Sequence, residues 1–437
     1  MKSISIFGLG YVGAVTASCL ASRGHRVIGV DPNPLKVERI GSGMSPIVEI
    51  GLPEMIAAAH RAGMISATSD ANDAVAGSEF SFISVGTPSQ RNGKLDLSYV
   101  RNVCSDIGRA LRKKNAFHWI VLRSTVLPGT TEKVVIPAIE AASGMIAGRD
   151  FQVCFNPEFL REGTSVADFF NPPFTIIGAD DPKQAAPVRD LYSFLPGHIY
   201  EIPIPAAEMI KYCCNAFHAL KIAFANEIGT ICNSLAIDPK TVADIFKADT
   251  RLNISPAYLT PGFAFGGSCL PKDLRALSYQ VRELDLRLPL LDSILPSNIE
   301  HIDRAAEAIL SLGRRRIGVL GISFKPGTDD LRESPMVHLV KKLIAEGCDV
   351  QIWDQNVSLG QLIGSNRDFI EAYIPHIGTL LRDDLNSVVD RAEVVVLATN
   401  AVRGDELAER LHEDQCLVDV ANLTPPVLKE AVAAVGR

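Results

Sequence analysis

A cysteine in a glycine-rich bend is the side chain in this sequence that best suits covalent chemistry. Cys269 follows the run 261–268, and Pro271 suits the first turn of a helix that residues 274–284 continue. The positive end of that helix dipole, with Lys272 close by in sequence, favours a thiolate, which is the nucleophilic form of the group. Because free cysteines are usually buried and inert, a small buried residue in a turn is the alternative interpretation.

Two glutamates form a second group of possible catalytic residues. Glu158 and Glu162 follow an expected strand at 151–155, and the segment between them is a possible helical turn. On such a turn the two carboxylates lie on one face and suit the roles of base and substrate holder. Two surface acids fit the sequence equally well.

A polar stripe runs along the long helical pattern from Ala206 to about Leu235. At about 100° per residue its members fall on one narrow face of an otherwise apolar helix. Buried polar groups need partners, so a Lys and an Asn one turn apart suit binding of a hydroxyl or an oxyanion. An exposed face of a bundle helix is the alternative. The stripe consists of Glu208, Lys211, Asn215, His218 and Asn226.

These residues need a scaffold, and the N-terminal segment indicates which one. Residues 3–7 predict a strand, 8–13 a tight turn, 14–23 a helix and 26–30 a second strand that ends at Asp31. The order of strand, G-x-G-x-x-G, helix, strand and acid is the setting that a dinucleotide-binding motif requires. A glycine-rich strand-to-helix turn without a ligand is the weaker alternative.

Each residue of this motif has a physical role. Gly8 makes the turn, Gly10 lets a pyrophosphate approach, and Gly13 lets the helix pack closely on the strand, while the helix N-terminus takes the phosphate charge. Asp31 accepts hydrogen bonds from a ribose and repels a 2′-phosphate, which favours NAD over NADP. Lys36 fits a place beside that ribose and fits a solvated helix equally.

Two later strands also lead into short polar loops. Thr87 follows the expected strand 80–85, and Thr125 follows the expected strand 119–122. Loops at the carboxyl ends of parallel strands form the ligand crevice of such sheets, so both threonines are candidate cofactor contacts. Helix capping explains either threonine as simply.

The totals describe an ordinary globular protein of more than one domain. The chain has 437 residues, 47% hydrophobic and 21% charged, and a net charge of -7, which argues against a nucleic-acid surface. Its nine cysteines contain no C-x-x-C pair, and we expect a reducing cytoplasm and no metal site. No apolar run reaches about 18 residues, so no membrane span is expected.

The strand pattern returns near the C-terminus. Strands are expected at 316–320 before Gly321, at 350–353 before Asp354, at 394–398 and at 416–420. The turn at Gly321 lacks the third glycine, and the polar loop 323–335 that follows suits a substrate phosphate, with a plain helix-entry loop as the alternative. We therefore expect an α/β fold with two doubly wound, Rossmann-like parallel-sheet domains joined by a central helical region. The expected boundaries are 1–202 for the NAD-binding domain, 203–300 for the central helical region and 301–437 for the second Rossmann-like domain.

Taken together, these motifs resemble the UDP-glucose and GDP-mannose dehydrogenase family over nearly the whole chain. The family implies an NAD domain, a helical region that forms a homodimer, and a C-terminal domain for the nucleotide sugar. The residues that carry the resemblance are Phe7 to Gly13, Val85 to Pro88, Ser124 and Thr125, Asn156 to Glu162, Lys211 with Asn215, Phe265 to Asp273 and Phe324 to Pro335.

The resemblance implies a four-electron oxidation of a sugar C6 alcohol to a carboxylate, with two NAD molecules reduced in turn. A water held by Lys211 and Asp273 is the implied base of the first step. Cys269 then attacks the C6 aldehyde, Lys211 and Asn215 stabilise the oxyanion, and a second hydride transfer gives a thioester. Glu158 is the residue we assign to the hydrolytic water. By resemblance Thr125 also belongs to the catalytic residues.

The resemblance also implies the ligand contacts. The implied substrate contacts are Glu162, His218, Asn226, Tyr258, Phe263, Gly266 and Lys325. The implied NAD contacts are Tyr11, Val12, Asp31, Lys36, Thr87, Thr125, Lys272 and Arg332.

Details of these motifs are more similar to the GDP-mannose branch of the family. The segments 215–221, 261–267 and 88–96 carry this likeness, and UDP-glucose enzymes more often have another residue at the position of His218. One position departs from both branches, because Thr260 stands where an arginine commonly reaches the sugar on the partner subunit. A UDP-hexose or UDP-hexosamine therefore stays open as the substrate.

Two functions from other classes share parts of this pattern. A catalytically silent sensor of NAD and nucleotide sugars would not need the cysteine and Lys211. A two-electron hydroxy-acid dehydrogenase shares the glycine motif but would not need a nucleophilic Cys269.

Overall fold

The chain packs as two compact units, residues 1–219 and 220–437. The computed structural model describes residues 1–259, 262–267, 269–324, 329–357, 364–398, 407, 410–412 and 414–420. Two predicted positions, Thr260 and Lys325, lie outside these ranges. No helix in the described ranges is both long enough and apolar enough to cross a bilayer.

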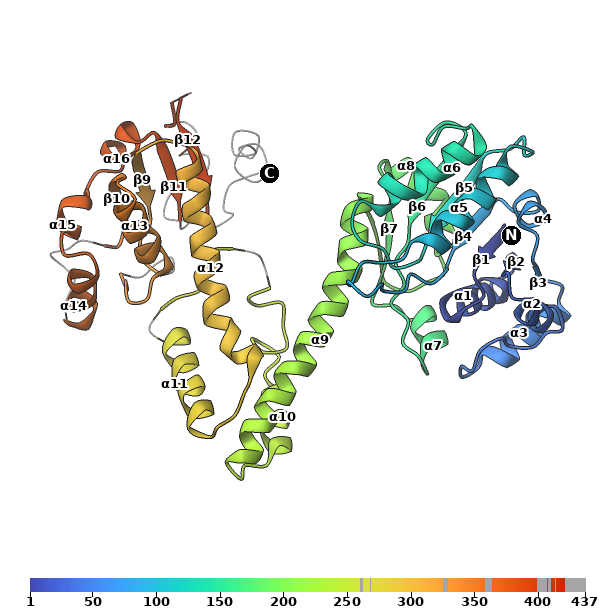
Figure 1. Ribbon diagram of the computed structural model, residues 1–437, viewed down its shortest axis with the longest axis horizontal. Coiled ribbons are helices and arrows are strands. Elements are labelled where there is room, and N and C mark those ends of the chain that lie inside the picture. Colours follow the sequence, from blue (N-terminus) through green and yellow to red (C-terminus); the bar gives the residue numbers. More distant parts are fainter. Residues whose placement is uncertain are drawn as a thin grey trace. The chain divides into compact units, whose positions relative to one another are not determined.

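An eight-stranded sheet organises the first unit (Figure 1), in the order β3-β2-β1-β4-β5-β6-β7-β8. The first six strands are parallel, whereas β7 runs antiparallel to β6 and parallel to β8. The strand order reverses between β1 and β4, which is the point where such sheets bind ligands. The strands are β1 (Ser3–Phe7), β2 (Arg26–Val30), β3 (Ile65–Thr68), β4 (Phe80–Ile83), β5 (His118–Leu122), β6 (Phe151–Phe155), β7 (Phe174–Gly178) and β8 (His198–Ile202).

Helices cover both faces of this sheet, as the continuous apolar strands predict. All of β4 and β6 is buried, which is typical of strands with helices on both sides. One core joins the sheet to α1, α3 and α8, and a second joins it to α4, α5 and α6. The helical segments are α1 (Tyr11–Ser22), α2 (Pro34–Gly41), α3 (Leu52–Arg61), α4 (Ala71–Ala76), α5 (Ser98–Leu111), η1 (Thr131–Val135), α6 (Ile136–Ser143), α7 (Ser165–Phe170) and α8 (Pro182–Asp190).

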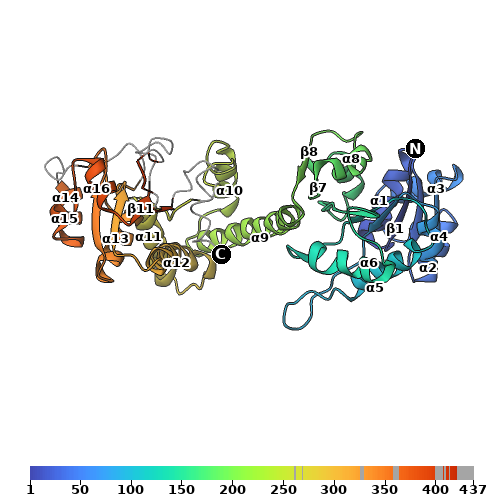
Figure 2. The ribbon, with the colours of Figure 1, turned by 90° about the horizontal axis from the view of Figure 1, so that it is seen from above.

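The long helix α9 (Ile204–Ser234) is one continuous rod in Figures 1 and 2. Its first turns are anchored by Glu208, a fully buried carboxylate that accepts hydrogen bonds from Gly129 N and from the amide and hydroxyl of Thr131. The expectation of a polar stripe on an otherwise buried helix is wrong. Glu208 and Lys211 are buried, whereas the later members Asn215, His218 and Asn226 are exposed on this chain.

The second unit combines helices with a smaller parallel sheet of order β10-β9-β11-β12. Its helix α12 begins at Pro289, and the Glu227 side chain accepts hydrogen bonds from the amides of Leu290 and Leu291 in the first turn. The elements are α10 (Pro239–Ala248), α11 (Leu270–Glu283), α12 (Pro289–Ser311), β9 (Arg316–Leu320), α13 (Pro335–Ala345), β10 (Asp349–Trp353), α14 (Gly364–Tyr373), α15 (Ile377–Leu380), α16 (Leu385–Arg391), β11 (Val394–Leu397) and β12 (Cys416–Asp419).

Both sheets use a carboxylate at the end of their second strand in the same way. In the first unit, Asp31 Oδ2 accepts a hydrogen bond from Leu9 N at 2.8 Å. In the second unit, Asp354 Oδ2 accepts one from Ile322 N, also at 2.8 Å. The recurrence of the N-terminal pattern that the sequence indicates is therefore confirmed in the fold.

Candidate functional site

The glycine turn between β1 and α1 leaves room for a ligand at one glycine and none at the others. Gly8 has φ +95°, and a Cβ on Gly13 would lie 1.8 Å from the Gly8 carbonyl oxygen, so neither position accepts a side chain. A Cβ on Gly10 would meet no atom of the described residues within 4 Å. The open side of the turn is thus the approach to the N-terminus of α1, where backbone amides favour an anion.

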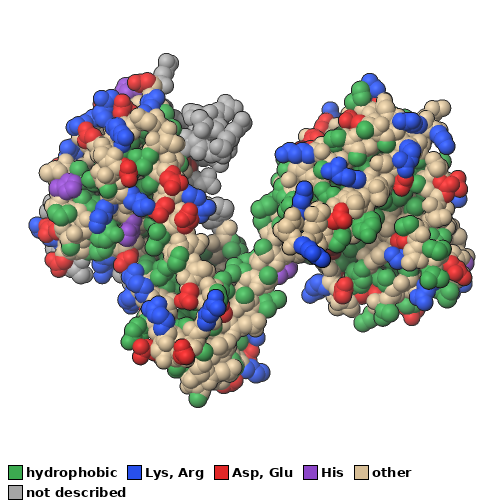
Figure 3. Space-filling model, viewed as in Figure 1, with side chains coloured by type: hydrophobic (Ala, Val, Ile, Leu, Met, Phe, Trp, Pro, Cys, Tyr) green, Lys and Arg blue, Asp and Glu red, His purple; other side chains and the backbone are tan. Residues whose placement is uncertain are grey.

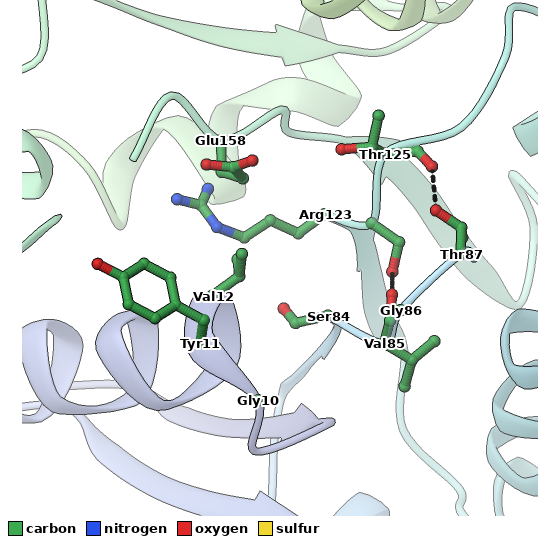
Figure 4. Close-up of a pocket in the computed structure, with 11 residues that line it drawn as sticks. Gly10, Tyr11, Val12, Ser84, Val85, Gly86, Thr87, Arg123, Thr125 and Glu158 are labelled. Carbon is green, nitrogen blue, oxygen red and sulfur yellow. Dashed lines mark hydrogen bonds between the residues drawn. The ribbon is translucent and has the colours of Figure 1, made fainter. Parts of the chain in front are cut away.

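A cavity of about 300 Å³ opens beside this turn, at the carboxyl ends of β1, β4, β5 and β6 (Figure 4). The Thr87 hydroxyl donates to the Thr125 carbonyl oxygen at 2.7 Å, and the Ser124 hydroxyl donates to Val85 O at 2.7 Å, which ties the β4 loop to the β5 loop. The structure therefore brings together residues predicted from separate motifs. The lining residues are Gly10, Tyr11, Val12, Ser84, Val85, Gly86, Thr87, Arg123, Ser124, Thr125 and Glu158.

Asp31 lies at the end of β2 and is 5% exposed. Its Oδ2 accepts from Leu9 N and from Lys36 Nζ at 3.1 Å, and its Oδ1 accepts from Asn33 N at 2.9 Å. Lys36 is therefore beside the acid, as one of the two sequence interpretations has it. The arrangement leaves a carboxylate and an ammonium at the place where a dinucleotide presents its adenine ribose.

These residues fit an NAD molecule that crosses the point of strand-order reversal. The open face at Gly10 suits a pyrophosphate, and Asp31 lies on the side of β2 and β3, where the adenosine half belongs. On the other side the cavity holds a buried polar atom, Arg123 Nε, that has no hydrogen-bond partner among the residues that the structure describes. The contacts with NAD themselves stay predictions.

Glu158 forms a buried ion pair with Lys211 of α9. Lys211 Nζ lies 2.9 Å from Glu158 Oε1 and 2.7 Å from the Glu158 carbonyl oxygen, and the two side chains are 9% and 13% exposed. Glu158 Oε2 also accepts from Leu160 N at 2.7 Å. The lysine thus has a fixed place at the edge of the cavity, set by the anchored first turns of α9.

The expectation that Glu158 and Glu162 share a face of a helical turn is wrong. Residues 156–161 form neither helix nor strand, and the next helix, α7, begins at Ser165. Glu158 is held by Lys211 and by a local amide, whereas Glu162 is exposed in the turn before α7. The two carboxylates therefore have separate environments.

Glu49 is a buried acid that joins the cofactor pocket to the loop after β6. Its carboxylate accepts hydrogen bonds from the Tyr11 hydroxyl, from Gly163 N at 2.9 Å and from Ser165 N at 3.1 Å. Burial opposes ionisation, but these donors outweigh it and hold the pKa of Glu49 below its usual value. Burial and the neighbouring carboxylate raise the pKa of Tyr11, which stays a donor. Sequence reasoning passed over Glu49, whose segment 42–51 has no motif.

We expect Glu49→Gln to loosen the loop after β6 without unfolding the first unit. Hydrogen bonds to charged groups contribute about 1.5–3 kcal/mol, so removal of the charge should raise amide exchange at Gly163 and Ser165 by at least about tenfold. The pKa of Glu49 is lowered in the folded state, so the ionised carboxylate stabilises the folded wild type. This stabilisation is fully present above the ordinary glutamate pKa and is lost as the pH falls through the lowered pKa. Hydrogen–deuterium exchange measures the effect.

The exposed Glu54 of α3 provides the matched control, since Glu54→Gln changes the same charge away from the loop. Equal exchange at residues 161–165 in wild type and in Glu49→Gln would contradict the role of Glu49.

Cys269 occupies the N-cap position of α11 and is exposed. The alternative of a small buried residue is therefore wrong. The backbone after it enters the helix at once, since Asp273 N donates to Cys269 O at 2.8 Å. Lys272 and Asp273 lie in the same first turn with their side chains 3.3 Å apart. The thiol thus has solvent access at the positive end of a helix, as the sequence predicts.

The bend before Cys269 is held from two sides. Asn298 of α12 binds both backbone groups of Phe265, with Phe265 N donating to Oδ1 at 2.9 Å and Nδ2 donating to the carbonyl oxygen at 2.8 Å. A Cβ on Gly266 would lie 2.2 Å from the Glu333 carbonyl oxygen, so the backbone of the bend packs directly on the segment before α13. Asn298 is a positioning residue that sequence reasoning missed, since it lies on an ordinary helical pattern.

A cavity of about 1160 Å³ within the second unit contains the thiol bend. Four residues predicted from different segments, Tyr258, Phe263, Gly266 and Cys269, all line it. Arg332 is paired with Asp330, whose carboxylate raises the pKa of Arg332, and Cys269 is close enough to add a smaller contribution in the same direction. The other lining residues are Gly262, Ala264, Phe265, Gly267, Leu270, Leu290, Ser293, Ile294, Ser297, Asn298, His301, Arg304 and Phe324.

Three family profiles cover most of the chain. Residues 2–195 match the NAD binding domain of the UDP-glucose/GDP-mannose dehydrogenase family, residues 205–300 match its central domain, and residues 318–426 match its UDP binding domain.

Curated relatives and solved structures agree with these profiles. The chain is 49% identical over 422 residues to the GDP-mannose 6-dehydrogenase of Pseudomonas aeruginosa, covering 97% of this chain and 94% of that protein. It is 36% identical over 359 residues to a UDP-glucose 6-dehydrogenase of Haloferax volcanii, covering 80% and 83%. A crystal structure of a ternary complex of the Pseudomonas aeruginosa GDP-mannose dehydrogenase has a TM-score of 0.94 at 48% identity and covers 97% of each chain. A UDP-glucose dehydrogenase of Pyrobaculum islandicum has a TM-score of 0.56 at 36% identity and covers 97% of this chain and 95% of that one.

Proposed function

Because the chain belongs to the UDP-glucose/GDP-mannose dehydrogenase family and is an NAD-dependent nucleotide-sugar dehydrogenase, we propose that its substrate is GDP-mannose. The product is then GDP-mannuronate. The observation that carries this choice is the higher identity to enzymes named GDP-mannose 6-dehydrogenase, 49% against 36% for a UDP-glucose enzyme, over a longer part of the chain.

Residues of both units have roles in the proposed reaction. NAD, when bound, supplies the hydride acceptor for each of the two oxidations. Gly10, Tyr11, Val12, Thr87 and Thr125 would hold it in the cavity beside α1. Asp31 and Lys36 at the β2 end, with Lys272 and Arg332 of the second unit, complete the proposed set of NAD contacts.

In the first step, a water held by Lys211 and Asp273 takes the proton of the C6 hydroxyl as hydride leaves the carbon. The Cys269 thiolate then adds to the aldehyde carbon, and Lys211 with Asn215 stabilises the oxyanion of the thiohemiacetal. Loss of a second hydride from that carbon gives the thioester. Water directed by Glu158 attacks the thioester, the carboxylate product forms and the thiolate is restored.

Sugar-nucleotide recognition is assigned to residues of both units. Phe263, Gly266 and Tyr258 line the cavity at Cys269 and support this assignment. The remaining proposed contacts are Glu162, Lys211, Asn215, His218, Asn226 and, outside the described residues, Lys325.

The stoichiometry of NADH tests the proposed function. Oxidation of GDP-mannose to the carboxylate should produce two NADH per sugar, measured by absorbance at completion. UDP-glucose and UDP-N-acetylmannosamine, run side by side, should react with kcat/KM at least about a hundredfold lower. One NADH per sugar, or preference for a UDP-sugar, would replace the proposal.

We also propose that the protein is a homodimer in the cytoplasm, with domain boundaries at 202 and 300. The helices of the central region support the dimer, because α9 and α10 expose large hydrophobic side chains (Figure 3). The cysteine content, without a C-x-x-C pair, supports a reducing compartment. The exposed hydrophobic side chains include Phe217 at 39%, Leu220 at 46%, Ile222 at 64%, Ile245 at 71% and Phe246 at 40%.

A charged residue in this apolar region should dissociate the dimer. Burial of an isoleucine at the interface contributes about 1.5–3 kcal/mol to the free energy of dimerisation. Each substitution is present twice in a two-fold symmetric dimer. We therefore expect Ile245→Glu to weaken dimerisation by at least about a hundredfold in sedimentation or light-scattering titrations. Lys240→Glu, at an exposed polar position of the same helix, is the control. A dimer of unchanged affinity in Ile245→Glu would place the interface elsewhere.

A further inference from the structure

Arg123 is a buried cation in the cofactor pocket whose charge has no acidic partner within the described residues. It follows the last residue of β5 and is 5% exposed. Its Nη1 donates to Asn156 Oδ1 and, at 3.4 Å, to the Tyr192 hydroxyl, both of which are uncharged. Its Nε is buried and finds no hydrogen-bond partner in the described part of the chain. A buried charge without a counter-ion is weakly screened, so this cation acts strongly on any charged group that enters the pocket.

Glu158, the other charged residue that lines this pocket, does not cancel the Arg123 cation. Figure 4 shows the Arg123 guanidinium reaching between Glu158 and Val12. Glu158 is already paired with Lys211 at 2.9 Å. These three side chains therefore leave a net single positive charge on this side of the cavity.

The position of Arg123 in the sheet indicates which half of the cofactor it faces. The strand order reverses between β1 and β4, and a dinucleotide lies across that point with one nucleotide on each side. Asp31, at the end of β2, belongs to the adenosine side. Arg123, at the end of β5, therefore lies on the nicotinamide side, together with Ser124, Thr125 and Glu158.

We propose that Arg123 is a fixed positive charge that favours the reduced over the oxidised nicotinamide. The oxidised ring is cationic and the reduced ring is neutral, so a buried cation repels only the oxidised form. Transfer of a hydride from the substrate carbon to the ring removes that repulsion. Between charges in a partly buried site this effect is worth about a factor of ten in equilibrium constant.

Binding measurements without any sugar nucleotide test the proposal, which rests on the NAD pocket alone. The dissociation constants of NAD⁺, NADH and ADP-ribose are measured by titration calorimetry on wild type, Arg123→Gln and Arg123→Lys. In wild type, NADH should bind more tightly than NAD⁺. In Arg123→Gln the ratio of the NAD⁺ constant to the NADH constant should fall about tenfold. The affinity for ADP-ribose, which has no nicotinamide ring, should stay the same.

The lysine variant separates charge from shape. Arg123→Lys keeps the charge and should keep the wild-type ratio, although its bond to Asn156 changes. Asp31→Ala should weaken the binding of all three ligands by the same factor. The adenine ribose that Asp31 contacts in the proposal is common to NAD⁺, NADH and ADP-ribose.

Three results would overturn the proposal. The first is an unchanged ratio in Arg123→Gln, with all three ligands weakened alike, which is the outcome if Arg123 only supports the Asn156 loop. The second is a fall in the ratio of the NAD⁺ to the NADH dissociation constant in Arg123→Lys, although that variant keeps the charge. The third is equal affinity of the wild-type protein for NAD⁺ and NADH. This result would contradict a preference for the reduced form, and it does not depend on the folding of any variant.

Discussion

Replacement of Cys269 by alanine should abolish the overall oxidation, with kcat lowered by on the order of 10⁴-fold or more. The thiolate is the proposed nucleophile that captures the aldehyde, and no other cysteine lies in the cavity at the start of α11. The exposed N-cap position gives this sulfur both solvent access and the favourable end of the helix dipole. Loss of the nucleophile leaves the aldehyde without a covalent route to the second oxidation.

Cys213 provides a matched control, since Cys213 and Cys269 are the two exposed cysteines of the chain. Cys213→Ala should retain wild-type turnover. Progress curves of NADH formation compare the variants, and intact-mass spectrometry of wild type quenched during turnover should show a sugar-nucleotide adduct that Cys269→Ala lacks. Full activity in Cys269→Ser would instead favour a two-electron dehydrogenase.

Replacement of Lys211 by methionine should lower kcat by about 10²–10³-fold. The ammonium is the proposed oxyanion donor, and its loss also leaves Glu158 as a buried carboxylate without its counter-ion. Breaking a buried pair in this way costs about 3–5 kcal/mol of stability, so thermal unfolding is measured alongside turnover. The double variant Lys211→Met with Glu158→Gln should regain most of the stability but not the activity.

This separation of stability from activity distinguishes the two roles of the lysine. Lys240→Met, at an exposed position of α10, should change neither quantity. Turnover of Lys211→Met within about threefold of wild type would remove the lysine from the proposed mechanism.

The sequence was most informative where backbone geometry and residue type are linked. The glycine turn, the acid after the second strand and the helix start at Cys269 are local features, and the structure has them where the sequence predicts them. The second doubly wound sheet was equally predictable from its repeated strand pattern. The strands β7 and β8 were not, because their short mixed segments carry no distinctive periodicity.

Contacts between distant segments were the part that local patterns missed. Glu49 binds the amide of Gly163, and Asn298 fixes Phe265, although nothing in the residues adjacent to either side chain marks it. The error at Glu158 and Glu162 has the same origin, because the helical turn assumed from their spacing competes with the ion pair that Lys211 offers. Tertiary partners, rather than spacing, determine which polar residues face a site.

The bond from the second-strand acid to the glycine turn has a consequence for motif-based annotation. Asp31 and Asp354 accept the same backbone hydrogen bond, although only the first turn has the full set of glycines. The acid therefore fastens the turn in both sheets of this chain, with or without the third glycine. Searches for dinucleotide sites should accordingly give more weight to the third glycine, Gly13, whose contact with Gly8 defines the close helix packing, than to the acid.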